Sequence, residues 1–286
     1  MCQGAKKKII SASRRTDLIA FFPEWLAKAV SEEEARIFGP SGHTYTVDLS
    51  PQNVHTVVLW SKNFANLINN HSGLRDEFQK YDQLYLHFTI NGLGGSFIEE
   101  GVPLPRIALS QLDSLIEIVG TSQRVSVRFD PIVYWLEDDK EMTNLHFFEE
   151  LAPVLQSKGI QNVRFSFTQW YNKAKRRAAK KNFVYIDPPL EKKVKDSEYL
   201  EQITKSYGLD LYICSQRTLS EASGIRPSSC IDGALLLELH PDKAPVSTKK
   251  DRTQRKECLC SESVDIGSYT QYCPHCCLYC YANPRI

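Results

Sequence analysis

The stretch Leu84-Tyr-Leu-His-Phe-Thr-Ile90 is one of six short runs of β-branched, aromatic and apolar residues that decide the fold of this chain. Polar or turn residues bound each run, and a stretch with helical spacing of apolar residues separates it from the next. Alternation of this kind predicts a parallel sheet whose strands are joined by right-handed crossovers. The six predicted strands span residues 8–12, 54–60, 84–90, 124–129, 162–167 and 209–214.

The spacers between these runs carry helix signals. Residues 21–30, 109–119 and 146–155 each repeat apolar side chains at helical spacing. Six β/α units are fewer than the eight of a closed TIM barrel. We therefore predict an α/β fold, a partial (β/α)6 TIM-like barrel over residues 1–216, with a cysteine-rich, metal-binding extension over residues 217–286 packed across the barrel mouth.

The composition bounds the class of protein. The chain has 286 residues, 42% of them hydrophobic, which is long enough for one large α/β domain with a buried core. The formal net charge is +1, so no overall field favours nucleic acid or an acidic membrane. No window approaches the roughly 18 apolar residues of a membrane span. We expect a cytoplasmic protein with no membrane partner, whose clustered cysteines are metal ligands or catalytic thiols rather than disulfides.

Polar side chains follow each predicted strand at the point where the strand ends. Barrels of this class build their sites at the C-terminal ends of the strands, so these side chains form the predicted site. A plainer explanation stays open, because Asp17 can cap the following helix and Asp130-Pro131 can form a turn. From position alone, we expect a cofactor to contact Asn91, Arg128 and Asp130, and the substrate to lie near Ser13 and the candidate catalytic residues Arg14 and Asp17.

The second decisive stretch is Cys273-Pro-His-Cys276-Cys277-Leu-Tyr-Cys280-Tyr-Ala-Asn, which holds four of the nine cysteines. Without Cys276, the remaining thiols follow the spacing C-x3-C-x2-C. Such a loop can turn three thiolates toward one point, which suits a [4Fe-4S] cluster whose usual complement is four cysteines. Three ligands leave one iron open to bind a small molecule. We therefore predict Cys273, Cys277 and Cys280 as cluster ligands.

This spacing resembles the signature of the radical S-adenosylmethionine enzymes, and the aromatic Tyr279 before the last thiol strengthens the resemblance. The resemblance implies a [4Fe-4S] cluster that binds S-adenosylmethionine, and a 5'-deoxyadenosyl radical that abstracts hydrogen from a substrate the sequence does not identify. It also implies a reductant such as flavodoxin or ferredoxin. One feature departs from that superfamily. The triad ends this chain, whereas the superfamily carries it near the N-terminal end of the catalytic domain.

Two further resemblances bear on function. From Ile-Ile-Ser-Ala-Ser-Arg-Arg-Thr-Asp at residues 9–17, through Arg-Phe-Asp-Pro-Ile at residues 128–132, to the cysteine tail, the chain is similar to an uncharacterised family known only as a domain of unknown function. That family brings no assigned reaction. The Cys-x-Tyr-Cys-Tyr ending is similar to that of the DNA-repairing spore photoproduct lyases. A nucleic-acid partner therefore stays open, although the near-neutral charge does not favour it.

Four other cysteines lie in the last third of the chain, at positions 214, 230, 258 and 260. Four thiols can close a second [4Fe-4S] cluster or a structural zinc site, and spacing alone does not separate the two. Alternatively, Cys214 and Cys230 are small buried hydrophobes. We expect Cys2 to be a bystander. Cys276 is either a spare thiol or part of paired Cys-x-x-Cys knuckles, and the neighbouring His275 is either a ligand or a hydrogen-bond donor.

A run of six basic residues within residues 173–181 predicts a basic helix. Such a run can bind phosphates, but a solvated face is the commoner explanation. The competing classes of function are a zinc-stabilised protein that binds RNA or a protein partner, and an electron-transfer protein with two fully ligated clusters. The iron and zinc content of the purified protein would separate them.

Overall fold

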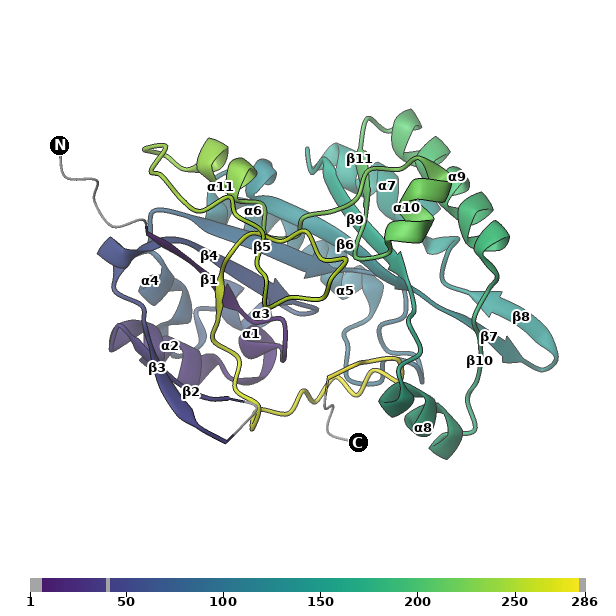
Figure 1. Ribbon diagram of the computed structural model, residues 1–286, viewed down its shortest axis with the longest axis horizontal. Helices are drawn as coiled ribbons and strands as arrows, with labels where there is room; N and C mark the ends of the chain where they lie inside the picture. Colours follow the sequence, from purple (N-terminus) through teal and green to yellow (C-terminus); the bar gives the residue numbers. More distant parts are fainter. Residues whose placement is uncertain (1–6, 40–41, 283–286) are drawn as a thin grey trace.

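The structure, a computed structural model, describes residues 7–39 and 42–282. Cys2 and Asn283 lie outside the described residues. At the centre is an open sheet of seven strands, all paired in parallel, in the order β11-β9-β6-β5-β4-β1-β12 (Figure 1). The strands are β1 (Lys8–Ala12), β4 (Val54–Ser61), β5 (Leu84–Thr89), β6 (Val125–Ile132), β9 (Asn162–Phe167), β11 (Asp210–Ile213) and β12 (Val264–Asp265).

All six predicted strands are present, and their parallel pairing is confirmed. The six predicted strands β1, β4, β5, β6, β9 and β11 lie side by side in their sequence order. Every crossover connection therefore advances in the same direction across the sheet. The seventh strand, β12, belongs to the C-terminal part and pairs with β1 on the opposite edge. Two residues are too few for a period-2 pattern, which is why the sequence did not predict this strand.

Helices cover one face of the sheet. Cβ atoms alternate between the two faces of a strand, so Leu86 and Phe88 of β5 point to the same side. Both are fully buried in the main hydrophobic core, together with helix residues such as Leu112 and Leu151. Each side chain of this size buried in the core contributes about 1.5–3 kcal/mol to stability. This core fixes the sheet against the helical layer.

The helices begin and end at recognisable signals. Helix α2 starts at Pro23, a position where the missing N–H of proline costs nothing, and α6 ends before Gly120, whose φ of 79° is the left-handed conformation common after a helix. The helices are α1 (Leu18–Phe21), α2 (Pro23–Ser31), α3 (Ala65–Ile68), α4 (Leu74–Phe78), α5 (Pro105–Ser110), α6 (Leu112–Val119), α7 (Phe147–Ser157), α8 (Asn172–Lys180), α9 (Leu190–Ser206), α10 (Arg217–Ser223) and α11 (Gly233–Leu239).

The C-terminal part of the chain covers the other face of the sheet. Tyr85 of β5 and Val58 of β4 pack with Ile231, Leu236 and Val246 in a separate buried cluster. Figure 1 shows this segment, light green to yellow, crossing in front of the strands. The sheet is therefore buried on both sides, by helices on one and by the extension on the other.

Two small antiparallel sheets complete the fold. One has the order β10 (Val184–Ile186), β7 (Tyr134–Glu137), β8 (Lys140–Thr143), and the other pairs β2 (Glu34–Phe38) with β3 (Thr44–Asp48). Neither was predicted. Among the described residues, no helix has the length and apolar character that crossing a membrane requires.

Candidate functional site

A cavity of about 820 Å³ opens at the C-terminal ends of the parallel strands. This is the edge at which α/β folds place their ligands, because the loops that follow the strands converge there. Side chains from both cysteine groups line it, together with predicted site residues from several strands. The lining includes Ser13, Arg14, Trp60, Lys62, Thr89, Arg128, Asp130, Cys214, Cys230, Cys258, Cys260, Tyr279, Cys280 and Tyr281.

Arg128 and Asp130 project from β6 into this cavity. The guanidinium donates to the Asp130 carboxylate and, through Nη1, to Sγ of Cys230 at 2.9 Å. Burial alone would lower the pKa of Arg128, but the neighbouring Asp130 raises it well above the ordinary value. Arg128 thus carries a permanent positive charge at the wall of the cavity, held beside a thiol. Its predicted contact with a cofactor stays a prediction.

Four cysteines meet at one side of the cavity, although they are spread over 47 positions of the chain, from 214 to 260. Sγ of Cys214, just after β11, lies 3.5 Å from Sγ of Cys230. Cys230 also contacts Cys260, which in turn contacts Cys258. The thiols thus form a continuous chain of sulfur contacts, and each borders the cavity. We call this the four-thiol group.

The buried inward face of the sheet holds Cys230 in place. His87 of β5 makes a hydrogen bond of 2.7 Å through Nε2 to the carbonyl oxygen of Cys230, and its ring stacks on Trp60 at 4.2 Å. Arg164 of β9 donates through Nε to Ser228 at 3.1 Å. Residues 228–230 are thus tied to three neighbouring strands.

Sequence reasoning missed His87, Trp60 and Arg164, although a signal was present. Each lies at an inward position of its strand, where a polar or amphipathic side chain interrupts an otherwise apolar run. A strand covered by helices on both faces would be apolar throughout. The interruptions therefore mark the face that receives the extension.

The contacts of Cys230 favour its thiolate. Hydrogen bonds from Cys214 and Cys260 hold its pKa well below the ordinary value, and the nearby Arg128 charge acts in the same direction. The contact with Cys260 likewise lowers the pKa of Cys258 to about 6. The same contacts act in the opposite direction on the other two thiols and raise the pKa of Cys214 and of Cys260 above the ordinary value. The thiolate is the form of cysteine that binds metals, so Cys230 and Cys258 are the two members of the group with the character of metal ligands.

The second group consists of Cys273, Cys277 and Cys280, and we call it the triad. The charges of Cys273 and Cys280 each act on Cys277, so the three thiols lie near one another. Cys277 is buried, and Cys280 lines the cavity beside the four-thiol group. Burial raises the pKa of Cys277 well above the ordinary value, and Glu99 adds to the effect.

Cys276 has a different environment, although it lies between two members of the triad. The charged groups that act on its thiol are Glu100 and Lys181, and its backbone has a φ of 55°. A left-handed residue reverses the direction of the chain, and the thiol of Cys276 has a different electrostatic environment from that of Cys277. The choice of the C-x3-C-x2-C thiols as ligands stays a prediction.

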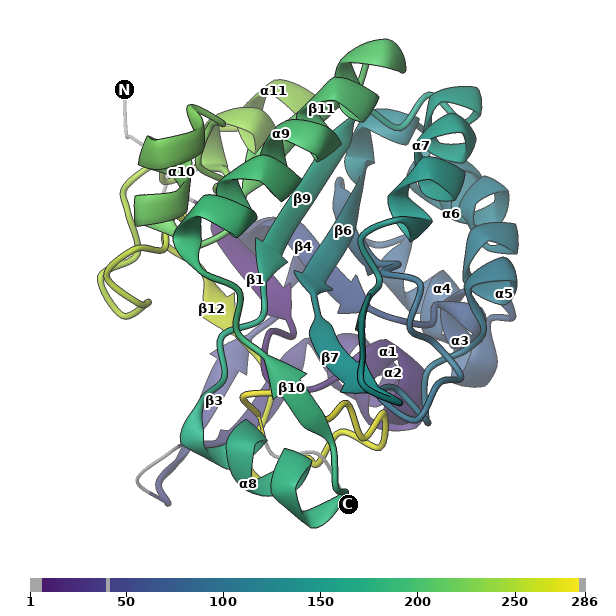
Figure 2. The ribbon, with the colours of Figure 1, turned by 90° about the vertical axis from the view of Figure 1, so that its right-hand side faces the viewer.

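His275 fastens the triad loop to the strand ends. Its Nε2 lies 2.8 Å from the Asp17 carboxylate, and its Nδ1 lies 2.9 Å from the carbonyl oxygen of Gly101. A side chain at Gly101 would come within 2.5 Å of the carbonyl oxygen of Pro274, so only glycine fits under the loop. His275 therefore serves as a hydrogen-bonding partner of Asp17, the second of the two roles expected for it. Figure 2 shows the tail, in yellow, lying between α8 and the helices α1 and α2.

Asp17 is fully engaged in this arrangement. It caps α1 through the N–H of Ala20 at 2.9 Å and accepts from the hydroxyl of Ser61 at 2.8 Å and the N–H of Lys62 at 2.9 Å, in addition to His275. The expected cap is confirmed. A carboxylate with this many partners positions the triad loop, and its assignment to catalysis stays a prediction.

A buried network joins Asn91 to the triad loop. Asn91 donates to Glu99 at 2.7 Å, Lys62 donates to the same oxygen at 2.8 Å, and the hydroxyl of Tyr279 donates to it as well. Glu99 is completely buried, and its other oxygen, Oε2, has no hydrogen-bond partner among the described residues. The aromatic residue of the cysteine motif is thus fixed by a carboxylate that keeps one acceptor unused.

Arg14 lines the cavity from the loop after β1. Its backbone N–H donates to Asp265 of β12 at 2.9 Å, and its Nη2 donates to Ser263 at 3.1 Å. Asp265 also accepts from the hydroxyls of Ser11 and Ser13, at 2.9 Å each. The unpredicted strand β12 therefore holds the loop that presents Ser13 and Arg14.

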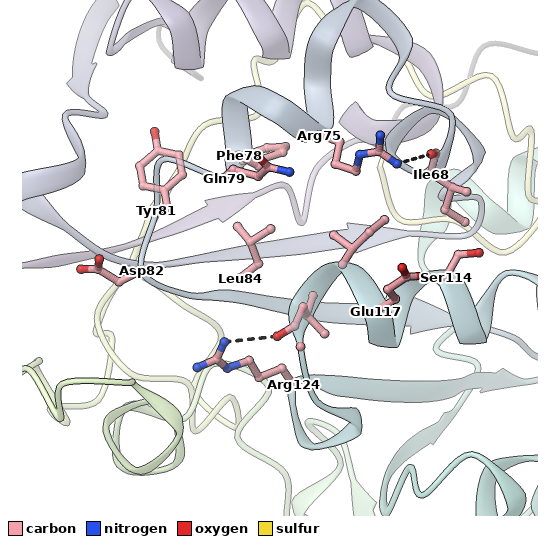
Figure 3. A pocket seen from close by; sticks show the side chains of 13 residues that line it. Ile68, Arg75, Phe78, Gln79, Tyr81, Asp82, Leu84, Ser114, Glu117 and Arg124 are labelled. Carbon is pink, nitrogen blue, oxygen red and sulfur yellow. Dashed lines mark hydrogen bonds between the residues drawn. The ribbon is translucent and has the colours of Figure 1, made fainter.

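A second cavity, of about 660 Å³, lies near the opposite ends of the strands, between α4 and α6 (Figure 3). Leu84, the first residue of β5, and Arg124, just before β6, are among its lining residues. No cysteine borders it. Its polar groups include Arg75, whose Nη1 is bound at 3.1 Å to the carbonyl oxygen of Ile68. The chemistry-bearing residues are therefore gathered in the first cavity.

Comparison with known proteins places this geometry in a family. The family described as "Domain of unknown function (DUF1848)" matches residues 9–282, nearly the whole chain. The chain belongs to this family. The matched residues include the strand ends, the four-thiol group, the triad and every residue that lines the first cavity. No curated protein matches the chain.

Proposed function

We propose that this member of the DUF1848 family is an iron-sulfur enzyme of the radical S-adenosylmethionine type, in which Cys273, Cys277 and Cys280 hold a [4Fe-4S] cluster. The observation that supports it most is that the triad loop folds back over the C-terminal ends of a parallel sheet and borders the cavity there. When bound, such a cluster supplies the electron that cleaves S-adenosylmethionine reductively to methionine and a 5'-deoxyadenosyl radical.

The arrangement of the six main strands supports the same proposal. Their sequential order, with every crossover advancing in one direction, is the order of a partial (β/α)6 barrel. We propose that the inward face of the sheet, which carries Trp60, His87 and Arg128, is the inner wall of this barrel. In this proposal residues 1–216 form the barrel and residues 217–286 the extension across its mouth.

The residues around the triad suit an amino-acid cofactor. Glu99 lies behind the cavity wall, where Lys62 and Tyr279 of the lining both donate to it, and among the described residues its Oε2 has no hydrogen-bond partner. We assign this acceptor to the ammonium group of the cofactor. Arg128 and Lys62 line the cavity and provide positive charge for the cofactor carboxylate. Asn91 orients the carboxylate of Glu99, and Asp130 orients Arg128.

The four-thiol group supports an auxiliary metal site. In the described part of the chain, neither the triad nor the four-thiol group, nor any other three His, Cys, Asp or Glu side chains, closes around a point as a bound metal ion requires. The four thiols are in contact from Cys214 through Cys230 and Cys260 to Cys258, and four thiolates suit either a [4Fe-4S] cluster or a zinc ion. We propose a second [4Fe-4S] cluster there, with structural zinc as the alternative that metal analysis separates.

Anaerobic purification and reconstitution with iron and sulfide test the proposal. The protein should be brown and bind about eight irons, four for each cubane. With a chemical reductant or reduced flavodoxin it should convert S-adenosylmethionine to 5'-deoxyadenosine, measured by chromatography. Colourless protein with stoichiometric zinc would favour the zinc-stabilised binding protein, and iron without S-adenosylmethionine cleavage would favour electron transfer.

A further inference from the structure

The two most basic segments of the chain flank the same cavity. One is residues 173–181 on and after α8, and the other is residues 249–256 in the extension. Together they carry eleven of the 35 lysines and arginines and one of the 34 acidic residues. Since the whole chain has a net charge of only +1, the positive charge is concentrated at this place.

Most basic side chains of the two segments face outward, whereas Arg177 is half-buried and donates through Nε to the carbonyl oxygen of Leu278 at 3.3 Å. On α8, Ala174 and Ala178 are buried, while Lys175, Arg176 and Lys180 are exposed. The helix therefore turns its small apolar residues inward and its charges to solvent. In the extension, residues 249, 250, 252, 255 and 256 are exposed bases, and Asp251 is buried with the hydroxyl and N–H of Thr253 as its partners.

A hydrogen bond ties the second basic segment to the residue just before α8 at the cavity mouth. Nη1 of Arg255 donates to the hydroxyl of Tyr171, the residue that precedes α8, at 3.0 Å. Asn172 and Lys173 line the cavity on one side, and Thr253 and Gln254 line it on the other. A polyanion bound to both segments would therefore pass directly over the opening.

Two tyrosines stand at this mouth with their rings partly exposed. Tyr171 is 39% exposed and Tyr281 is 53% exposed. Their ring centroids are 6.4 Å apart at an angle of 62°, and the guanidinium of Arg255 lies 5.8 Å from the ring of Tyr281. Exposed aromatic faces among basic side chains are what nucleic-acid bases stack on, and neither a phosphopeptide nor a membrane surface requires them.

From this juxtaposition we propose that the protein binds single-stranded nucleic acid across the cavity mouth. The basic segments contact the phosphates, and Tyr171 and Tyr281 stack a base over the opening. A single strand fits better than a duplex, because a base must leave its stack to reach a cavity beneath the aromatic pair. Binding does not depend on the proposed radical chemistry. Only the further step, that the bound strand is the substrate, rests on it.

Fluorescence anisotropy of labelled oligonucleotides about twelve nucleotides long tests the proposal on the purified full chain, without reductant or S-adenosylmethionine. Reversing two charges on α8, Lys175→Glu with Arg176→Glu, should weaken binding at least about tenfold. It should also reduce the slope of log affinity against log salt by about 1.4, the value for two lost contacts on a single strand. Tyr171→Ala and Tyr281→Ala should each weaken it about tenfold through lost stacking.

The matched control changes the net charge equally on another exposed surface, Lys195→Glu with Lys205→Glu on α9, and should alter affinity less than about twofold. Equal weakening by the two double variants would overturn the proposal, as would no binding at about 50 mM salt. Tighter binding of a duplex than of the single strand would overturn it too. So would a polyphosphate of equal charge that competes as strongly as the oligonucleotide does. Failure of S-adenosylmethionine cleavage alone would leave it standing.

Discussion

The two cysteine groups meet at one cavity, which all four thiols of the four-thiol group and Cys280 of the triad line, but they are assembled in different ways. The triad lies within eight residues of one loop, whereas the four-thiol group brings together Cys214 at the end of β11 and Cys230, Cys258 and Cys260 from the extension. One group is therefore a property of local chain geometry, and the other exists only because the extension packs on the sheet.

The groups also differ in what holds them. The triad loop depends on a few contacts at one place, chiefly His275 with Asp17 and with Gly101. The four-thiol group is fixed by side chains of neighbouring strands, among them His87 and Arg128. We infer that the loss of a single contact of His275 disturbs the whole triad. The four-thiol group, by contrast, tolerates the loss of one of its contacts with the strands.

The largest effect is expected within the triad loop itself. Cys277→Ala should reduce formation of 5'-deoxyadenosine to background, because it removes one of the three proposed cluster ligands. Cys276→Ala is the matched control, since Cys276 is not among the proposed ligands and Glu100 and Lys181 are the charged groups that shift the pKa of its thiol, and it should retain most of the activity. Chromatographic assay of both reconstituted variants checks this. Equal losses would show that the ligands are misassigned.

The next effect separates the two groups by their iron. Changing Cys258 and Cys260 together to Ala should lower the iron content from about eight to about four per chain, because only one cubane would remain. Reductive cleavage of S-adenosylmethionine should persist, since the triad is untouched. Iron analysis by mass spectrometry measures the change. An unchanged iron content would eliminate the auxiliary cluster.

A smaller effect concerns the anchor of the triad loop. Asp17→Asn keeps the shape of the side chain but removes the charge that accepts from Ser61, Lys62 and His275, and it should lower the free energy of unfolding by about 2 kcal/mol. The tail should also become more sensitive to protease. Urea unfolding measures the first effect and limited proteolysis the second.

Asp139→Asn, in the exposed turn between β7 and β8, is the control for this anchor and should change stability by less than about 0.5 kcal/mol. An Asp17→Asn variant that is equally stable and keeps a protected tail would contradict the anchoring role.

The smallest effect depends on pH and concerns the extension. His55 lies 2.9 Å from the carbonyl oxygen of Ala244, with its ring against His240, and burial lowers the pKa of His55 to about 4. The unfolded chain takes up a proton on this residue near pH 6.5, so the stability that neutral His55 provides is present above that pH and is lost as the pH falls toward 4.

Unfolding curves measured between pH 7 and pH 4 test this. His55→Gln should flatten that part of the pH dependence, because the titrating group is gone. If hydrogen exchange on acidification shows the segment around Ala244 exposed before the triad loop, that order would support the different attachment of the two groups. An unchanged pH profile in the variant would show that other residues cause the loss.

The amino-acid sequence by itself determined the six main strands and the triad. Both are local patterns. The period of two along a strand and the spacing of Cys273, Cys277 and Cys280 are each set within about ten residues, where backbone geometry alone relates one side chain to the next. The polar residues after the strands could likewise be named, because parallel strands bring their ends to one edge.

Only the tertiary structure decided which distant residues the strands and the cysteines contact. It added β12 and the two small antiparallel sheets, engaged Asp17 with His275, joined the four thiols, and paired residues 173–181 with residues 249–256 at the cavity mouth. These contacts join positions up to 258 residues apart, and no local pattern encodes them. They follow from which face of the sheet the extension covers, a choice made by packing its apolar side chains against Tyr85 and Val58.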